Sequence, residues 1–228
     1  MSSAMKRVVL ISASPKIGEP SASDLLVTWQ ESRMEANGVS YERIDVRHCL
    51  ARKETDAAFA AMLAADALII TFPLYFFCLP GMLMRFLQDY YQYWAQRNDE
   101  ARPAQVYAVV NCGFPEPSIN EEAVRVVQSF SDKIGAVFRF GLKISGGGML
   151  LGAKDAPIMK KTIAHLNSAF DTMAKDIVTG GSAPLANIEI AMNFPRRLYL
   201  WVGNWGWGSM ARKNGLKKRD LYRKPYRP

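Results

Sequence analysis

Residues 6–26 read KRVVLISASPKIGEPSASDLL: a short apolar run, a loop rich in serine, and the start of a helical pattern. The run at 8–11 holds four consecutive branched aliphatic residues, which is typical of a strand buried on both faces of a parallel sheet. After the loop, apolar residues begin to recur at helical spacing. A strand that leads through a polar loop into a helix predicts the first unit of an α/β fold.

The same order repeats along the chain. Short apolar runs rich in branched residues predict strands at 8–12, 41–46, 67–71, 106–111 and 136–142. Segments of helical period predict helices at 23–36, 54–65, 80–94, 120–134 and 156–178. Regular alternation requires right-handed crossovers between parallel strands, so the sequence predicts a doubly wound sheet of five parallel strands with helices on both faces.

Turn-forming residues at 179–182 mark a change of composition, after which the chain becomes aromatic and basic. We therefore expect a compact domain at 1–182 and a C-terminal extension at 183–228. The whole chain has a formal net charge of +8. Residues 196–228 hold ten Lys and Arg against one acid, a charge of +9, which leaves −1 for residues 1–195. The basic character thus belongs to the extension and is separate from the chemistry of the domain.

Signals for a membrane span, secretion and cysteine-based structure are lacking. No run of 18 uncharged apolar residues is found, and the apolar run after Arg7 is too short for a signal peptide. Cys49, Cys78 and Cys112 are odd in number and form no C-x-x-C pair, which argues against a disulfide framework, a metal site and an iron–sulfur cluster. We expect a cytoplasmic protein with reduced thiols.

The serine-rich loop has the composition of a phosphate site. Ser14, Lys16, Ser21 and Ser23 bring hydroxyl and ammonium donors to the start of a helix, where free N–H groups and the positive end of the helix dipole also lie. A helix cap by Ser21 or Ser23 is the alternative, but it explains neither the other serines nor the lysine. Because the sequence has no P-loop pattern and no G-x-G-x-x-G after this strand, a mononucleotide phosphate fits best.

Three further loops follow predicted strands at the same edge of the sheet, where open α/β sheets bind ligands. Residues 71–81, TFPLYFFCLPG, carry aromatic side chains that could wall a planar ring; packing into the core is the alternative. Residues 111–117 and 145–149 carry glycines that permit close approach of the backbone to a ligand. The convergence of four loops on one edge is the stronger indication of a binding site.

Three motifs in these loops resemble one known family. They are S-P-K followed by S-x-S-x-x-L at 14–26, P-L-Y-x-x-x-L-P-x-x-L at 73–83, and N-C-G-F-P-E at 111–116. Together they are similar to the flavodoxin-like NAD(P)H-dependent FMN reductases and quinone reductases, over residues 6–178. The resemblance implies that the predicted sheet is flavodoxin-like.

The resemblance also implies FMN as cofactor and assigns residues to it. Around the phosphate it places Ser14, Lys16, Ser21, Ala22 and Ser23; beside the isoalloxazine ring, Pro73, Leu74, Tyr75 and Phe76 with Asn111, Cys112, Gly113 and Phe114; near the outer edge of the ring, Gly146, Gly147 and Gly148. The first loop departs from the commonest family pattern, S-P-R followed by G-N-[ST], because Glu19 and Pro20 follow Gly18. We expect the Glu19 carboxylate to point away from the phosphate.

By the same resemblance, the protein is an oxidoreductase in which NAD(P)H reduces bound FMN, leaves, and is replaced by a quinone or another small electron acceptor. The flavin performs the chemistry, so no catalytic side chain is assigned. His48 and His165 have no triad or metal-ligand spacing around them. Two alternatives stay open: a flavodoxin-type electron carrier that a partner protein reduces, and a non-catalytic binding module whose tail engages a partner.

The extension gathers aromatic residues before a basic end. Phe194, Tyr199, Trp201, Trp205 and Trp207 precede a basic cluster between residues 212 and 219. Aromatic residues beside cations suit an anionic membrane surface, so peripheral membrane contact is one expectation. Packing on the domain or across a homodimer is another, whereas nucleic acid is disfavoured because the domain is near neutral and no recognised motif is present.

Overall fold

The computed structural model describes residues 6–97, 103–181, 185–224 and 226 of the chain. Residues 1–192 form one compact unit and residues 193–228 a second. The first unit extends beyond residue 182, the boundary that the sequence suggested for the domain, because a short strand lies after it.

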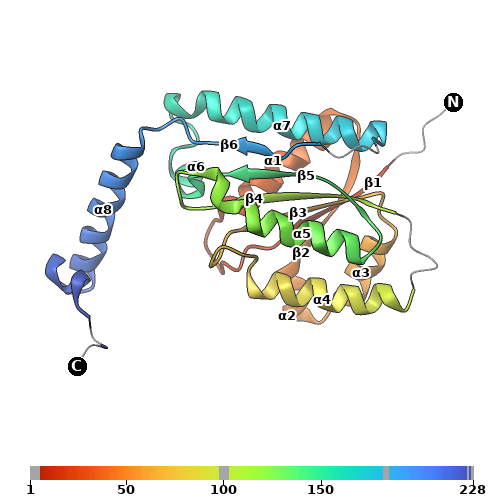
Figure 1. The fold of residues 1–228 in the computed structure, drawn as a ribbon, viewed down its shortest axis with the longest axis horizontal. Helices are drawn as coiled ribbons and strands as arrows, with labels where there is room; N and C mark the ends of the chain where they lie inside the picture. Colours follow the sequence, from red (N-terminus) through yellow and green to blue (C-terminus); the bar gives the residue numbers. More distant parts are fainter. Residues whose placement is uncertain (1–5, 98–102, 182–184, 225, 227–228) are drawn as a thin grey trace. The chain divides into compact units, whose positions relative to one another are not determined.

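The first unit contains a parallel sheet in the order β2-β1-β3-β4-β5-β6 (Figure 1). Its strands are β1 (Arg7–Ser12), β2 (Ser40–Asp45), β3 (Ala67–Pro73), β4 (Gln105–Asn111), β5 (Val137–Ile144) and β6 (Ile188–Ile190). The parallel α/β fold is confirmed, but the expected number of five strands is wrong. The sixth strand pairs only three residues with β5, and a segment so short has no readable period.

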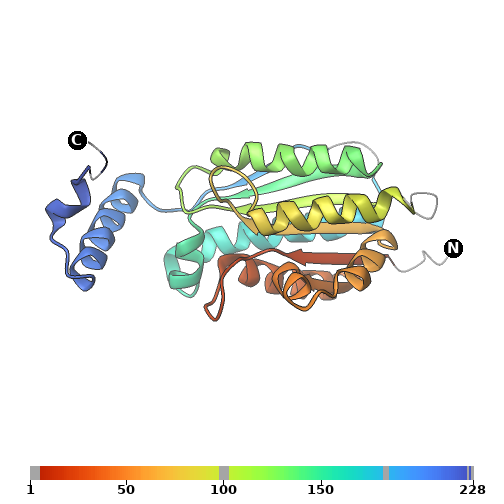
Figure 2. The same cartoon turned by 90° about the horizontal axis from the view of Figure 1, so that it is seen from below.

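Helices cover both faces of the sheet (Figures 1 and 2). Their bounds are α1 (Ala22–Ala36), α2 (Val46–Arg52), α3 (Thr55–Leu63), α4 (Gly81–Ala95), α5 (Glu121–Lys133), α6 (Gly147–Ala153) and α7 (Lys160–Thr179), with short 3₁₀ turns at η2 (Pro117–Asn120) and η3 (Pro157–Met159). α1 and α7 pack together on one face, and α3, α4 and α5 lie on the other. The loop expected at 145–149 instead leads directly into α6 at Gly147, despite the low helix propensity of glycine.

The central strands β1, β3 and β4 are buried on both faces, as the unbroken apolar runs of β1 and β3 predicted, whereas the edge strand β2 is mostly exposed. On one face, Ile11, Ile70 and Val110 pack with Phe86 of α4 and Val127 of α5 in a continuous apolar core. Such a core of branched residues stabilises the sheet by removing apolar surface from water on each side. The sheet therefore forms a rigid base from which the loops at its carboxyl edge project.

A buried ion pair ties the opposite face to α7. The Arg139 guanidinium on β5, only 2% exposed, donates to both oxygens of Asp176 on α7 at 2.8 and 2.7 Å, and the Tyr107 hydroxyl on β4 donates to the same carboxylate at 2.7 Å. Burial alone would raise the pKa of Asp176, but the hydrogen bonds from Arg139 and Tyr107 outweigh it and hold that pKa below its ordinary value. This network links three elements through one carboxylate.

The second unit consists of α8 (Arg196–Lys213) and the 3₁₀ turn η4 (Lys218–Tyr222). The two are joined where the Leu216 N–H bonds to the Ala211 carbonyl at 2.8 Å. Among the residues described in this unit, only Ala211 is buried. No helix in the described ranges is long and apolar enough to cross a bilayer.

Candidate functional site

Four loops meet at the carboxyl edge of the sheet and enclose a cleft of about 180 Å³. It is lined by Ser14, Lys16, Ser21, Ala22, Ser23, Pro73, Leu74, Tyr75, Asn111, Cys112, Gly113, Gly147, Gly148 and Leu151. All of the residues that the sequence assigned to a cofactor site line this cleft, except Phe76, Phe114 and Gly146. The sequence did not indicate Leu151 as a cleft residue, because Leu151 lies on α6 and no helix was expected there.

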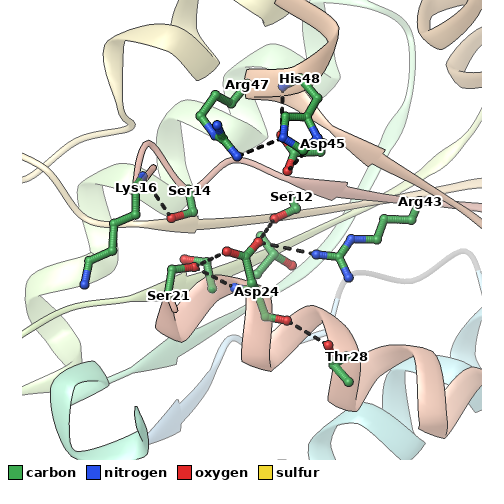
Figure 3. Close-up of polar contacts among 12 residues, drawn as sticks. Ser12, Ser14, Lys16, Ser21, Asp24, Thr28, Arg43, Asp45, Arg47 and His48 are labelled. Atoms are coloured by element: carbon green, nitrogen blue, oxygen red, sulfur yellow. Dashed lines mark hydrogen bonds and ion pairs between the residues drawn. The ribbon is translucent and has the colours of Figure 1, made fainter. Parts of the chain in front are cut away.

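The first loop is organised around a carboxylate that the sequence did not single out. Asp24 accepts hydrogen bonds from the Ser12 hydroxyl at 2.7 Å and the Ser21 hydroxyl at 2.5 Å (Figure 3). Ser21 is also the N-cap of α1, since its Oγ accepts the Asp24 N–H at 3.0 Å. Arg43 of β2 lies 3.4 Å from the same carboxylate and balances its charge. A serine followed three residues later by an acid, at the start of a helix, was the signal that could have identified this pair.

Several donors in the loop remain available to an anion. The Ser14 and Ser23 oxygens accept hydrogen bonds from the Lys16 N–H at 3.4 Å and from the Asn111 amide at 2.8 Å, which leaves both hydroxyl protons to point elsewhere. The N–H groups of Ala22 and Ser23 lie in the first turn of α1, where backbone N–H groups have no partner within the helix. The dipole of α1 adds positive potential at the same place. This donor set suits a phosphate.

Lys16 contributes the positive charge at this end of the cleft, but it is shared. Its ammonium lies 3.8 Å from the Glu19 carboxylate and 3.5 Å from the Pro20 carbonyl oxygen. Both side chains of the ion pair are well exposed, and exposed pairs of this kind are weak. Lys16 can therefore exchange Glu19 for a doubly charged phosphate.

The floor of the cleft is tied together by Asn111 at the end of β4. Its amide donates to the Ser23 hydroxyl at 2.8 Å and to the Phe72 carbonyl oxygen at 3.2 Å. A Cβ at position 147 would lie 2.8 Å from the Asn111 Oδ1, so only glycine fits there. Gly146 has φ of +60°, and a Cβ on it would meet Met192 at 2.4 Å. The loops after β1, β3, β4 and β5 are thereby fixed against one another.

The loop after β3 makes a tight turn at its tip. Tyr75 and Cys78 exchange two backbone hydrogen bonds of 2.9 Å, and the two residues between them, Phe76 and Phe77, have φ of 48° and 60°. Two-residue turns with positive φ at both positions normally carry Asn-Gly, and each bulky residue held in this region costs about 1–3 kcal/mol. Phe76 is fully exposed and lies outside the cleft lining, whereas Phe77 stacks on Phe114 with ring centroids 6.1 Å apart.

Cys112 lines the cleft without the features of a reactive thiol. Burial raises its pKa, against the opposing effect of hydrogen bonds from the Phe114 backbone and the Asn120 amide, so the thiol stays protonated at neutral pH. His48 contacts Arg47 and Asp45 beside β2 (Figure 3). Among the residues that the structure describes, no three His, Cys, Asp or Glu side chains could hold a metal ion.

Comparisons with known proteins give matches in sequence and in fold. The sequence model of the NADPH-dependent FMN reductase family matches residues 6–148. The fold is similar to an NADH:FMN oxidoreductase in its apo form, at 18% identity over 85% of this chain and 98% of that chain, with a TM-score of 0.55. It is also similar to an NAD(P)H:quinone oxidoreductase from Methanothermobacter marburgensis, at 13% identity over 76% and 96%, with a TM-score of 0.56. No curated protein matches the sequence.

Proposed function

The chain belongs to the family of NADPH-dependent FMN reductases, and we propose that it uses FMN in the cleft at the carboxyl edge to pass electrons from NAD(P)H to a quinone or a similar small acceptor. At the level of the family, it is a flavin oxidoreductase with FMN as cofactor and NAD(P)H as electron donor. The quinone acceptor and the residues that hold FMN are the proposal.

The donor set of the first loop is the observation that carries it. The donors at one end of the cleft are Lys16, the hydroxyls of Ser14 and Ser23, and the first N–H groups of α1, and this set supports a cofactor phosphate there. Pro73, Leu74, Tyr75 and the 111–113 segment line the rest of the cleft, which has few charged groups and suits a planar ring. The cleft, at about 180 Å³, is smaller than the usual 300–1,000 Å³ of ligand pockets, so part of a mononucleotide would extend beyond it.

The protein's part in the reaction is to bind and position. When bound, FMN supplies a ring that accepts two electrons from the nicotinamide and gives them to the acceptor. Lys16 and the dipole of α1 offset the charge of the phosphate, and the hydrogen bonds of Asn111 to Ser23 and to the Phe72 carbonyl keep the cleft floor in place. In the net reaction the C4–H bond of the dihydronicotinamide breaks, and its electron pair and its hydrogen pass to the quinone. One proton from solvent supplies the hydrogen of the second O–H bond of the hydroquinone.

Anaerobic mixing of the FMN-loaded protein with NADPH tests this function. We expect the visible flavin absorbance to bleach within minutes and to return when a quinone is added. A flavodoxin-type carrier would show no bleaching by free nicotinamide, and a binding module would purify colourless and fail to take up FMN.

Lys16→Ala should weaken FMN binding roughly tenfold, as the loss of one charge-assisted hydrogen bond predicts, whereas Lys160→Ala, which removes an exposed lysine of α7, should leave FMN binding unchanged.

The second unit favours a further role, contact with an anionic membrane surface. On α8, Trp201 and Trp205 are 65% and 64% exposed, and Leu198 and Val202 share their helical face. Tryptophan prefers the interface between lipid and water, and the excess of basic residues here complements anionic lipid headgroups. Both tryptophan side chains are largely exposed, and insertion into a lipid surface would bury them.

Vesicle co-sedimentation tests this contact. The full chain should sediment with vesicles that contain phosphatidylserine, and a chain that ends at Met192 should not. Trp201→Ala together with Trp205→Ala should reduce binding while the flavin spectrum stays the same. Equal sedimentation of the full and shortened chains would contradict the role.

Two further expectations from the sequence stay predictions. One is a cytoplasmic location, which suits the free thiols of Cys49, Cys78 and Cys112, and the other is a homodimer.

A further inference from the structure

The turn at Tyr75–Cys78 combines two features that folding does not explain. Its two central residues have positive φ, where Asn-Gly would be unstrained, and both are phenylalanine. Phe76 is 100% exposed and Phe77 is 59% exposed, so neither ring packs in the core, where burial would offset the cost of the positive φ. A conformation that is held against its local preference, with its apolar groups turned to solvent, points to a role in binding.

The turn is placed at the lip of the cleft. Tyr75, the residue before the pair, lines the cleft, and Leu74, bonded through its N–H to the Asn111 carbonyl at 2.8 Å, fixes the base of the loop. From the other side, Phe114 follows the cleft residues Cys112 and Gly113 and stacks on Phe77 at an interplanar angle of 19°. Figure 2 shows the loops after β3 and β4 at the same end of the sheet. Three exposed rings thus stand next to the mouth of the cleft.

We propose that Phe76, Phe77 and Phe114 form a docking surface for the ring of an apolar, aromatic or quinonoid electron acceptor. The proposal rests on the function proposed above, because it names the class of acceptor that this cleft serves. Side chains without a polar atom favour a planar apolar ring, which can stack on them and leave water. They offer nothing to the charged phosphates of NAD(P)H. The surface binds and orients the acceptor, while the electrons and protons follow the net reaction already given.

The most informative variant replaces the pair with the residues that the turn prefers, Phe76→Asn together with Phe77→Gly. Relief of the strain should raise the melting temperature, or at least keep it, so that a loss of activity does not stem from unfolding. The ratio of kcat/KM for 2-methyl-1,4-naphthoquinone to that for ferricyanide should fall roughly tenfold, as the loss of stacking partners predicts. Phe76→Tyr together with Phe77→Tyr keeps both rings and should retain most of the ratio.

Controls separate this proposal from the function on which it rests. Tyr91→Ala removes an exposed aromatic side chain from α4, outside the cleft, and should change neither acceptor rate. If wild-type protein is not reduced by NADPH, the proposed function fails, and the docking surface, which rests on it, fails with it. If reduction occurs but the ratio is unchanged in the Asn-Gly variant, the docking surface is wrong. Equal loss with both acceptors, or loss confined to reduction by NADPH, would also overturn it, since the turn would then shape the cofactor or nicotinamide site.

Discussion

The two units of the chain use charge and apolar surface in opposite ways. In residues 1–192 the buried cations are paired, Arg139 with Asp176 and Lys143 with Glu121 and Glu189, and the apolar side chains fill the two faces of a sheet. Residues 193–228 contain ten Lys and Arg and only one acid, and the tryptophans of α8 are largely exposed. The first unit therefore buries its apolar side chains and pairs its buried charges, whereas the second leaves both the tryptophans of α8 and its basic residues largely exposed.

The largest expected effect tests whether buried pairs carry the stability of the first unit. Asp176→Asn leaves the Arg139 guanidinium buried without its carboxylate, which should cost about 3–5 kcal/mol of unfolding free energy. Urea unfolding, followed by circular dichroism, measures it. Asp155→Asn removes a carboxylate from an exposed pair with Lys154 and should change stability by less than about 1 kcal/mol. Similar effects of the two variants would break the contrast between buried and exposed charge.

The same carboxylate predicts how stability depends on pH. The pKa of Asp176 in the folded protein is below its ordinary value, so its contribution is fully present above the unfolded pKa of about 3.9. The contribution is lost as the pH falls through the folded pKa, because both states then bind the proton. The difference in unfolding free energy between wild type and Asp176→Asn should thus be constant near neutral pH and shrink in acid. A difference that stayed constant down to pH 2 would contradict the assignment.

A smaller effect is expected from the charge of the second unit. Lys217→Glu together with Lys218→Glu should weaken binding to phosphatidylserine vesicles by about 1 kcal/mol or more for each position, and added salt should weaken wild-type binding in the same direction. The unfolding transition of residues 1–192 should stay where it is, since neither lysine belongs to that unit. A shift of that transition would show that the second unit helps to stabilise the first.

The sequence predicts most of this fold because its central strands, β1, β3 and β4, are buried on both faces. Unbroken apolar runs such as 8–11 identify central strands without any knowledge of their partners. β6, with three residues, and α6, which begins with glycines, lack such a signal. In the structure β6 pairs with β5, and α6 packs on α1. The position of the cleft could also be predicted, because the topology of a parallel sheet places the loops that follow its strands at one edge.

Side-chain geometry inside the site could not be predicted in the same way. Asp24 reads as an ordinary acid in the first turn of a helix, and only the structure brings Ser12, Ser21 and Arg43 to its carboxylate. The sequence predicts that Phe76 lines the cleft, but in the structure this residue has a positive φ and its ring is exposed to solvent. Such details depend on backbone angles and on contacts between residues that are distant in sequence, neither of which a residue pattern specifies.

The smallest expected effect asks whether local charge, rather than net charge, sets phosphate binding in the near-neutral first unit. Glu19→Gln removes the carboxylate that shares the Lys16 ammonium and should tighten FMN binding by about 0.2–1 kcal/mol, up to roughly fivefold in Kd. Fluorescence titration of the apo-protein with FMN measures the change, and Glu122→Gln, on the exposed side of α5, changes the net charge equally as the control. If both variants tighten binding to the same extent, the long-range field is responsible. If only Glu19→Gln does so, then Glu19 competes with the phosphate for Lys16, and a single contact governs phosphate binding in the first unit.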